Sequence, residues 1–103
     1  MAICNILEDS RHTALQAEQV AAHLCTTGPV LPEGARLFLS GCADPGWRAV
    51  TVWDSTEARD RFIVERLVPA YEAVGLSFDG VRRTQFKVQM LTAGDLFGAP
   101  RPA

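Results

Sequence analysis

Several features that often reveal a function are missing from this sequence. No apolar run approaches the roughly 20 residues needed to cross a bilayer, so we expect no membrane-spanning segment. Basic residues number only ten, all but Lys87 are arginine, and the formal net charge is −2. A chain without a positive excess lacks the electrostatic footprint that nucleic acid or an acidic membrane surface requires. We therefore expect neither as a partner.

Cysteine and histidine are too few and too scattered for a disulfide framework or a metal site. The three cysteines, Cys4, Cys25 and Cys42, cannot all pair within the chain, and the sequence contains no CxxC or Cys/His spacing of the kind that binds zinc. The first ten residues contain no basic leader and no small-residue cleavage site, so we expect no signal peptide. These absences predict reduced thiols, no bound metal and a cytoplasmic location.

What the sequence does contain is a regular order of strand-like and helix-like runs. Alternating apolar residues predict strands at 2–8, 35–41, 47–53 and 84–91. Apolar residues spaced three and four positions apart predict one helix from a capping box at Thr13 to about Cys25. Asp44, Pro45 and Gly46 suit a tight turn, which makes the second and third strands a β-hairpin.

The second predicted helix starts near Asp54 and ends at Gly75. Asp54 is the expected N-cap, with Ser55 as a competing cap one position later. Pro69 lies inside the helical pattern, where it removes a backbone hydrogen bond and clashes with the preceding turn. We therefore expect a kink, or a helix that restarts around Val68.

This order of elements predicts an α+β fold of the ferredoxin-like type, βαββαβ, with a four-stranded antiparallel sheet. We expect one domain over residues 1–103, with about 92–103 as a C-terminal tail. Both helices should cover one face of the sheet. The strands at 2–8 and 47–53 have apolar residues on both sides, so the other face must also be buried. A second copy of the chain is the simplest cover, and we expect a homodimer through that face.

A few side chains are candidates for chemistry. Trp47 and Trp53, the only tryptophans, lie on one side of the same predicted strand. They line a ligand pocket if that side looks toward the helices, or else they are core or interface anchors. Asn5 lies in mid-strand, where a carboxamide is costly to bury without partners. His23 and His12 are possible general bases, although His23 also suits a partly buried helix end and His12 a solvated loop.

For two other groups of residues we expect a structural role. Tyr71 shares the apolar stripe of the second helix, so its ring should pack while its hydroxyl reaches toward a pocket. The charged run that contains Arg61, Glu65 and Arg66 is expected to form a solvated helix face.

The segment from Gly46 to Gly75, "GWRAVTVWDSTEARDRFIVERLVPAYEAVG", resembles small dimeric α+β barrel proteins of the antibiotic biosynthesis monooxygenase superfamily. The similar features are the Gly-Trp-Arg opening, the Val-Trp-Asp-Ser strand end and the helix with Phe, Glu-Arg-Leu and Pro-Ala. Many uncharacterised actinobacterial members look like this stretch. The resemblance covers about thirty residues closely and the others only through the order of elements.

The resemblance implies a dimer in which two sheets meet, with a pocket in each subunit between sheet and helices. The superfamily includes cofactor-free quinone-forming monooxygenases, haem-degrading enzymes and polyketide-modifying enzymes. The haem-degrading members need a histidine on the second helix, and positions 55–74 contain none. For cofactor-free oxygenation the resemblance implies deprotonation of a phenol or anthrone beside dioxygen, with Asn5, Trp53 and either Arg48 or Arg83 in the pocket.

The main hypothesis is therefore a protein that binds a small aromatic or polyketide-like molecule, as a cofactor-independent monooxygenase or another tailoring enzyme. The candidate catalytic residues are Asn5, His23 and Trp53, and the candidate binding residues are Trp47, Arg48, Phe62, Tyr71 and Phe86. One alternative is a non-catalytic dimeric binding or structural protein. Another is a non-redox cyclase or isomerase that uses His23 as its base.

Overall fold

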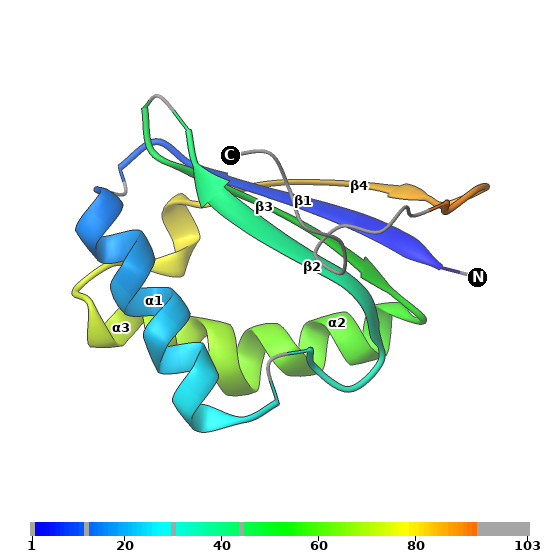
Figure 1. Cartoon of the computed structure of the whole chain (residues 1–103), viewed down its shortest axis with the longest axis horizontal. Coiled ribbons are helices and arrows are strands. Elements are labelled where there is room, and N and C mark those ends of the chain that lie inside the picture. The colour runs from blue at the N-terminus through cyan, green and yellow to red at the C-terminus, as the bar shows by residue number, and fades with distance from the viewer. Residues whose placement is uncertain (1, 12, 30, 44, 93–103) are drawn as a thin grey trace, which may run out of the picture.

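A four-stranded antiparallel sheet with helices on one face forms the molecule (Figure 1). The computed structural model describes residues 2–11, 13–29, 31–43 and 45–92. The strands are β1 (Ile3–Asp9), β2 (Ala35–Cys42), β3 (Trp47–Trp53) and β4 (Arg82–Lys87), in the order β2-β3-β1-β4. The helices are α1 (Ala14–Thr27), α2 (Thr56–Phe62) and α3 (Val68–Ala73). The predicted ferredoxin-like βαββαβ fold is therefore confirmed.

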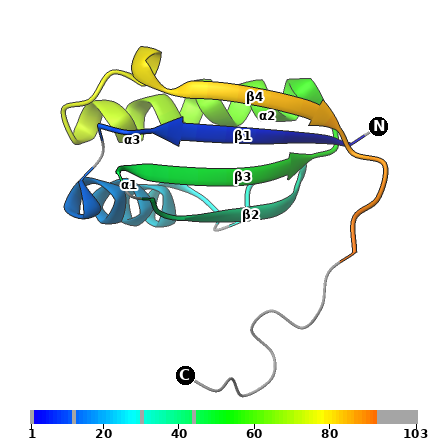
Figure 2. The same cartoon turned by 90° about the horizontal axis from the view of Figure 1, so that it is seen from above.

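The layers separate clearly when the sheet is seen from above. Figure 2 shows α1 near the β2 edge of the sheet, and α2 and α3 toward the β4 edge. Both helical segments lie behind the same face, so the opposite face carries no helix in the described part of the chain. We call that opposite surface the open face. The predicted tail at 92–103 lies outside the described residues from position 93 onward.

The side chains of strand β3 alternate between the two faces of the sheet. One side of the strand is formed by Trp47, Ala49, Thr51 and Trp53, which are all buried. This side faces the helices, because Trp47 contacts Tyr71 and Trp53 contacts Phe62. Trp53 packs on Phe62 with ring centroids 5.3 Å apart. Val52, which alternates with these residues, points to the open face and is also buried. The tryptophans therefore join the sheet to its helices.

The helix starts agree with the sequence in one case and correct it in the other. Thr13 caps α1 by accepting a hydrogen bond from the Gln16 backbone at 3.1 Å, while the Gln16 side chain accepts from the Thr13 backbone. This is the predicted capping box. For α2 the N-cap is Ser55, whose Oγ accepts from the Ala58 backbone at 3.2 Å. The preference for Asp54 was wrong and the competing cap, Ser55, is the one observed, while the Asp54 carboxylate accepts a hydrogen bond from Arg36 instead.

The second helical segment contains the interruption that Pro69 predicts. A π-helical turn, η1 (Ile63–Leu67), separates α2 from α3, and the Val68 backbone N–H donates to the carbonyl of Ile63 five residues earlier. This wider turn moves the carbonyl four residues before Pro69 out of the way of its ring. The prediction that the helix restarts around Val68 is confirmed.

The last strand begins and ends earlier in the chain than the sequence predicted. Strand β4 covers Arg82–Lys87, whereas 84–91 was predicted. That prediction left residues 76–83, including Arg82 and Arg83, as a linker after the second helix. A short 3-10 helix at Phe78–Gly80 occupies part of that linker. The sequence placed this strand too late because all six residues of β4 are exposed, so no buried face marks its bounds.

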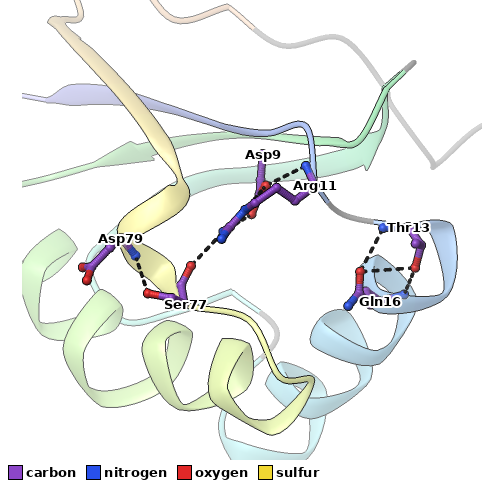
Figure 3. A network of polar contacts seen from close by, with 6 residues as sticks. All are labelled: Asp9, Arg11, Thr13, Gln16, Ser77 and Asp79. Atoms are coloured by element: carbon purple, nitrogen blue, oxygen red, sulfur yellow. Dashed lines mark hydrogen bonds and ion pairs between the residues drawn. The ribbon is translucent and has the colours of Figure 1, made fainter.

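An ion pair between an exposed arginine and a buried carboxylate closes the end of the sheet where β1 leads into α1. The Asp9 side chain is fully buried and accepts from Arg11 Nε at 2.9 Å and Nη2 at 2.8 Å (Figure 3). Arg11 Nη2 also donates to the carbonyl of Ser77, 2.7 Å away. A bidentate fork of this kind fixes direction as well as charge. It therefore ties the start of the α1 connection to the segment before β4.

Tyr71 is completely buried below this ion pair. Its ring meets Trp47 edge-on at 6.3 Å between centroids and Phe78 at 5.2 Å. Burial raises the pKa of Tyr71 well above its usual value, and the negative charge of Asp9 adds to the rise while Arg11 opposes it. The phenol is therefore held in its neutral form.

Replacing Gly46 by alanine is expected to destabilise the fold by at least about 2 kcal/mol. Gly46 has φ +91°, and a Cβ there would clash with the Asp9 carbonyl oxygen. Gly75→Ala is the matched control, because Gly75 has φ +81° but nothing within 4 Å of the added atom. Urea unfolding should show a smaller loss, about 1 kcal/mol, for the control. Equal losses would contradict the close approach to Asp9.

Tyr71 is expected not to ionise while the protein is folded. A pKa raised above the unfolded value of about 10 means that stability is lost as pH rises through and beyond that value. Because Tyr71 is the sole tyrosine, tyrosinate absorbance reports on it alone. The absorbance should rise together with loss of the native circular dichroism signal, and Tyr71→Phe should flatten the alkaline dependence of stability. Ionisation near pH ~10 in the native fold would contradict the burial of this side chain.

Candidate functional site

A cavity of about 180 Å³ opens between α1, the sheet and the start of η1. Apolar side chains form most of its wall. The lining residues are Ala17, Val20, Ala21, Leu24, Cys25, Phe38, Ser40, Trp47, Phe62 and Arg66. We call this space the α1 cavity.

The α1 cavity results from the choice of small residues on one helix. Ala17 and Ala21 face large rings on the sheet and on α2, so the side chains do not fill the distance between the layers. An apolar cavity of about 150 Å³ is known to hold a benzene molecule and to exclude water. The volume of the α1 cavity therefore suits one aromatic ring, with larger groups extending through the mouth.

Arg66 is the charged residue in this wall. Its Nη2 donates to the carbonyl of Leu24 at 2.6 Å and its Nη1 to the carbonyl of Pro29 at 3.0 Å. The guanidinium also lies over the Phe62 ring, 5.3 Å from the ring centroid. The expectation of a solvated face holds for the exposed Arg61 and Glu65. It was wrong for Arg66, because the π turn directs this side chain toward α1.

Two of the predicted binding residues line the α1 cavity. Trp47 contributes to its wall from β3 and Phe62 from the end of α2. Trp47 is 5% exposed and Phe62 is 6% exposed, so both rings are held by packing. Phe38 meets Phe62 edge-on at 5.8 Å and completes an aromatic wall. Phe38 belonged to the predicted second strand but was not among the predicted binding residues.

Asn5 and Trp53 lie deeper, around a void of only about 10 Å³. The indole N–H of Trp53 donates to Thr51 Oγ1 at 2.8 Å, and that hydroxyl donates to the Asn5 backbone carbonyl at 3.3 Å. The Trp53 donor is therefore already used inside the core. A void of this size holds about one water molecule. Asn5 and Trp53 thus surround a second, smaller void, which shares Phe38, Trp47 and Phe62 with the wall of the α1 cavity.

Arg59 also lines this small void, and sequence reasoning missed it. It is 8% exposed, and its guanidinium donates to the Gln85 side chain from β4 and to Asp60. Asn5 is the direct strand partner of Gln85, so these polar groups share one place under the sheet. The position of Arg59 among apolar residues of the helix stripe was the available sign.

Arg48 and Phe86 lie on the open face, away from the α1 cavity. Arg48 is the strand partner of Glu8, with Nε 3.5 Å from the Glu8 carboxylate. Phe86 pairs with Cys4 in the same register and is 55% exposed. The structure therefore separates these two residues from the other predicted binding residues. Alternation along the strands decides their side.

The remaining candidates do not line the α1 cavity either. Tyr71 is enclosed in the core beside Trp47. His23 is half-buried on α1, and its backbone carbonyl accepts a hydrogen bond from Thr26. His12 lies outside the described residues. Cys25, which was not among the candidates, does line the cavity and is a free, exposed thiol.

Metal ligation and membrane insertion find no support in the described residues. Across 2–11, 13–29, 31–43 and 45–92, no group of three or more His, Cys, Asp and Glu side chains is placed to hold a metal ion. None of the helices formed by these residues has the length and apolar character needed to cross a membrane. The cytoplasmic location stays a prediction.

Similarity to known proteins is structural. No protein-family model and no curated protein matches the sequence. A dimeric ferredoxin-like protein of unknown function from Jannaschia sp. CCS1 aligns with TM-score 0.59 and 15% identity, over 85% of this chain and 100% of its own.

Two further solved structures carry functional descriptions. A putative antibiotic biosynthesis monooxygenase from Deinococcus radiodurans has TM-score 0.57 and 17% identity, covering 92% of this chain and 99% of its own. A point mutant of SnoaB, a cofactor-independent oxygenase from Streptomyces nogalater, has TM-score 0.56 and 16% identity, covering 87% and 95%. At these identities the likeness shows the fold. This chain therefore shares its ferredoxin-like fold with antibiotic biosynthesis monooxygenase-type proteins, as the sequence resemblance predicted.

Proposed function

We propose that this chain binds a small aromatic molecule in the α1 cavity. The observation that carries the proposal is an apolar space of about 180 Å³ with an aromatic wall and one cation, Arg66. Ligand sites are usually concave and apolar with a few placed polar groups, which describes this cavity. Of the two kinds of ligand that the sequence suggested, its size favours a small aromatic molecule of one or two rings over a polyketide-like molecule.

Cofactor-independent oxygenation is the reaction that we propose for such a ligand. Its support is the shared fold with SnoaB and with the Deinococcus protein, which is an argument from analogy. In this chemistry a ring carbon with two hydrogen atoms, as in the keto form of an activated phenol, loses one of them as a proton to solvent, and the resulting carbanion passes electrons to dioxygen. One oxygen atom becomes a carbonyl on that carbon and the other leaves as water.

The residues around the α1 cavity have distinct roles in this proposal. Trp47 and Phe62 hold the ring by packing, and the guanidinium of Arg66 stabilises the negative charge that deprotonation creates. Asn5 and Trp53 surround the smaller void that shares part of its wall with the α1 cavity. His23 does not line the cavity, so the proposal does not use it as the base.

The open face of the sheet is proposed as a homodimer interface. Val52 and Cys4 are already buried there, while Leu39 and Phe86 are exposed at the rim. Support comes from the fold shared with the Jannaschia protein, which is described as dimeric. Two copies joined through these faces would cover the apolar side chains that one chain leaves in contact with water.

Ala21→Phe is expected to weaken binding of aromatic ligands at least tenfold, because the new ring occupies the α1 cavity. Ala21 is exposed on α1 and lines the cavity, so the change does not disturb the buried core. Ala22→Phe is the control, since Ala22 is equally exposed on the same helix but does not line the cavity. Binding of phenol is followed through the Trp47 indole signal in a nitrogen-15 NMR spectrum, assigned with Trp47→Phe.

Oxygen consumption by the same proteins separates enzyme from binding protein. With activated phenols, uptake in the wild type and the Ala22→Phe protein but not in Ala21→Phe supports the oxygenase. Binding without uptake leaves the non-catalytic alternative. Equal binding by both variants, or no binding by any protein, would show that the α1 cavity is not a ligand site.

Leu39→Glu is expected to convert a dimer to a monomer, because it places a charge in the proposed interface. Leu39 is 49% exposed on the open face, so the folded monomer should tolerate the change. Leu15→Glu is the control, since Leu15 is 62% exposed on α1, away from that face. Sedimentation equilibrium measures the mass. A wild-type monomer, or a Leu39→Glu protein that stays dimeric, would exclude this interface.

A further inference from the structure

The charge of Arg66 lacks a counterion in the described structure. Its two hydrogen bonds go to the backbone carbonyls of Leu24 and Pro29, which are neutral. Among the described residues no carboxylate forms an ion pair with it. Arg11, Arg36, Arg48 and Arg59 each lie within 4 Å of an acidic side chain. The other described arginines without such a partner, Arg61, Arg82 and Arg83, are exposed to water, whereas Arg66 is partly buried. A cation in an apolar wall is costly without an opposite charge.

One hydrogen-bond donor of Arg66 is also unsatisfied. The Nε atom is shielded from solvent and has no acceptor among the described residues. A buried donor of this kind loses its water without gaining a partner, so such groups are rare and call for an explanation. The two carbonyl bonds use one hydrogen on each Nη atom, so the guanidinium in the wall of the α1 cavity keeps a second hydrogen on each Nη for an acceptor.

The position of the guanidinium is fixed before any ligand binds. The π turn directs Arg66 toward the end of α1, and Phe62 supports its flat face. Gly28 lies directly against it, since a Cβ at Gly28 would be 2.8 Å from Arg66 Cζ. Glycine is required here for close approach and not for its backbone angle, because its φ of 173° is extended. A preorganised cation binds its partner with less loss of side-chain freedom.

From these observations we infer that the ligand of the α1 cavity is an aromatic carboxylate, with its ring against Trp47 and Phe62 and its carboxylate against Arg66. The inference rests on the proposed function, since it names the chemistry of that ligand. The planar fork of arginine matches a carboxylate in shape as well as in charge. The lining contains no acidic residue that would repel such a group.

Two isosteric probes test this inference on the intact protein. 4-Fluorobenzoate carries the charge, 4-fluorobenzamide does not, and fluorine NMR gives the dissociation constant of each. The wild type is expected to bind the carboxylate at least tenfold more tightly than the amide, as a charged hydrogen-bonded contact gives. In Arg66→Met this preference should disappear while amide binding stays within about twofold of the wild type.

Further variants keep the test independent of any loss of stability in Arg66→Met. Gly28→Ala retains Arg66 and its charge but displaces the guanidinium, so the preference for the carboxylate should fall. Gly41→Ala, where an added Cβ meets nothing within 4 Å, should leave it unchanged. Arg61→Gln removes one exposed positive charge from the same helical segment without touching the α1 cavity, and it should also leave the preference unchanged.

The outcomes separate this inference from the proposed function. If the wild type binds both probes equally, or if Arg66→Met and Gly28→Ala keep the full preference, the carboxylate assignment is wrong while the cavity remains a ligand site. If neither probe binds, or if Ala21→Phe does not weaken binding of either, the proposed function itself fails. A preference that also falls in Arg61→Gln would indicate general attraction by charge and would overturn the role of Arg66.

Discussion

The contact between β3 and the helices is the constraint on which the other features depend. Trp47 packs against Tyr71 of α3, and Trp53 packs against Phe62 of α2. The two rings therefore set the distance between the sheet and these helices. Trp53 fills its place and satisfies its N–H on Thr51. Trp47 faces small alanines on α1, so space is left beside it. One strand therefore provides a closed core at one end and a cavity wall at the other.

The π turn links the backbone to the chemistry of that cavity. Pro69 makes a regular helix unfavourable, and the turn that accommodates it redirects Arg66 toward the carbonyl groups at the end of α1. The carbonyls that end a helix have no partner within it, so the arginine stabilises the end of α1. Arg66 thus has a structural role through one hydrogen of each Nη atom and keeps the other Nη hydrogens for a second partner. π turns are frequent at functional sites, which agrees with this arrangement.

Much of the fold could be predicted because local rules and burial agree. The capping box at Thr13, the turn at Gly46 and the restart at Val68 each follow from the chemistry of a few neighbouring residues. The edge strand β4 was misplaced because its residues are all exposed, so no burial constrains their pattern. The candidate site was predictable only in part. Trp47 and Phe62 belonged to recognisable stripes, whereas Arg66 depends on a helix that departs from 3.6 residues per turn.

The π turn also makes the length of this segment critical. It contains one residue more than an α-helical turn, so the chain after Leu67 is rotated by about 100° relative to an uninterrupted helix. If the same residues formed a regular α-helix, Ala70 would take the place of Tyr71 and the Tyr71 ring would turn away from Trp47 and Phe78. Loss of one residue from the π turn would restore a regular helix and keep Tyr71 on the sheet. Loops usually tolerate such changes in length. In this helical stretch the π turn is the place where one residue can be lost, because a loss after Leu67 would change which side of α3 is buried against the sheet.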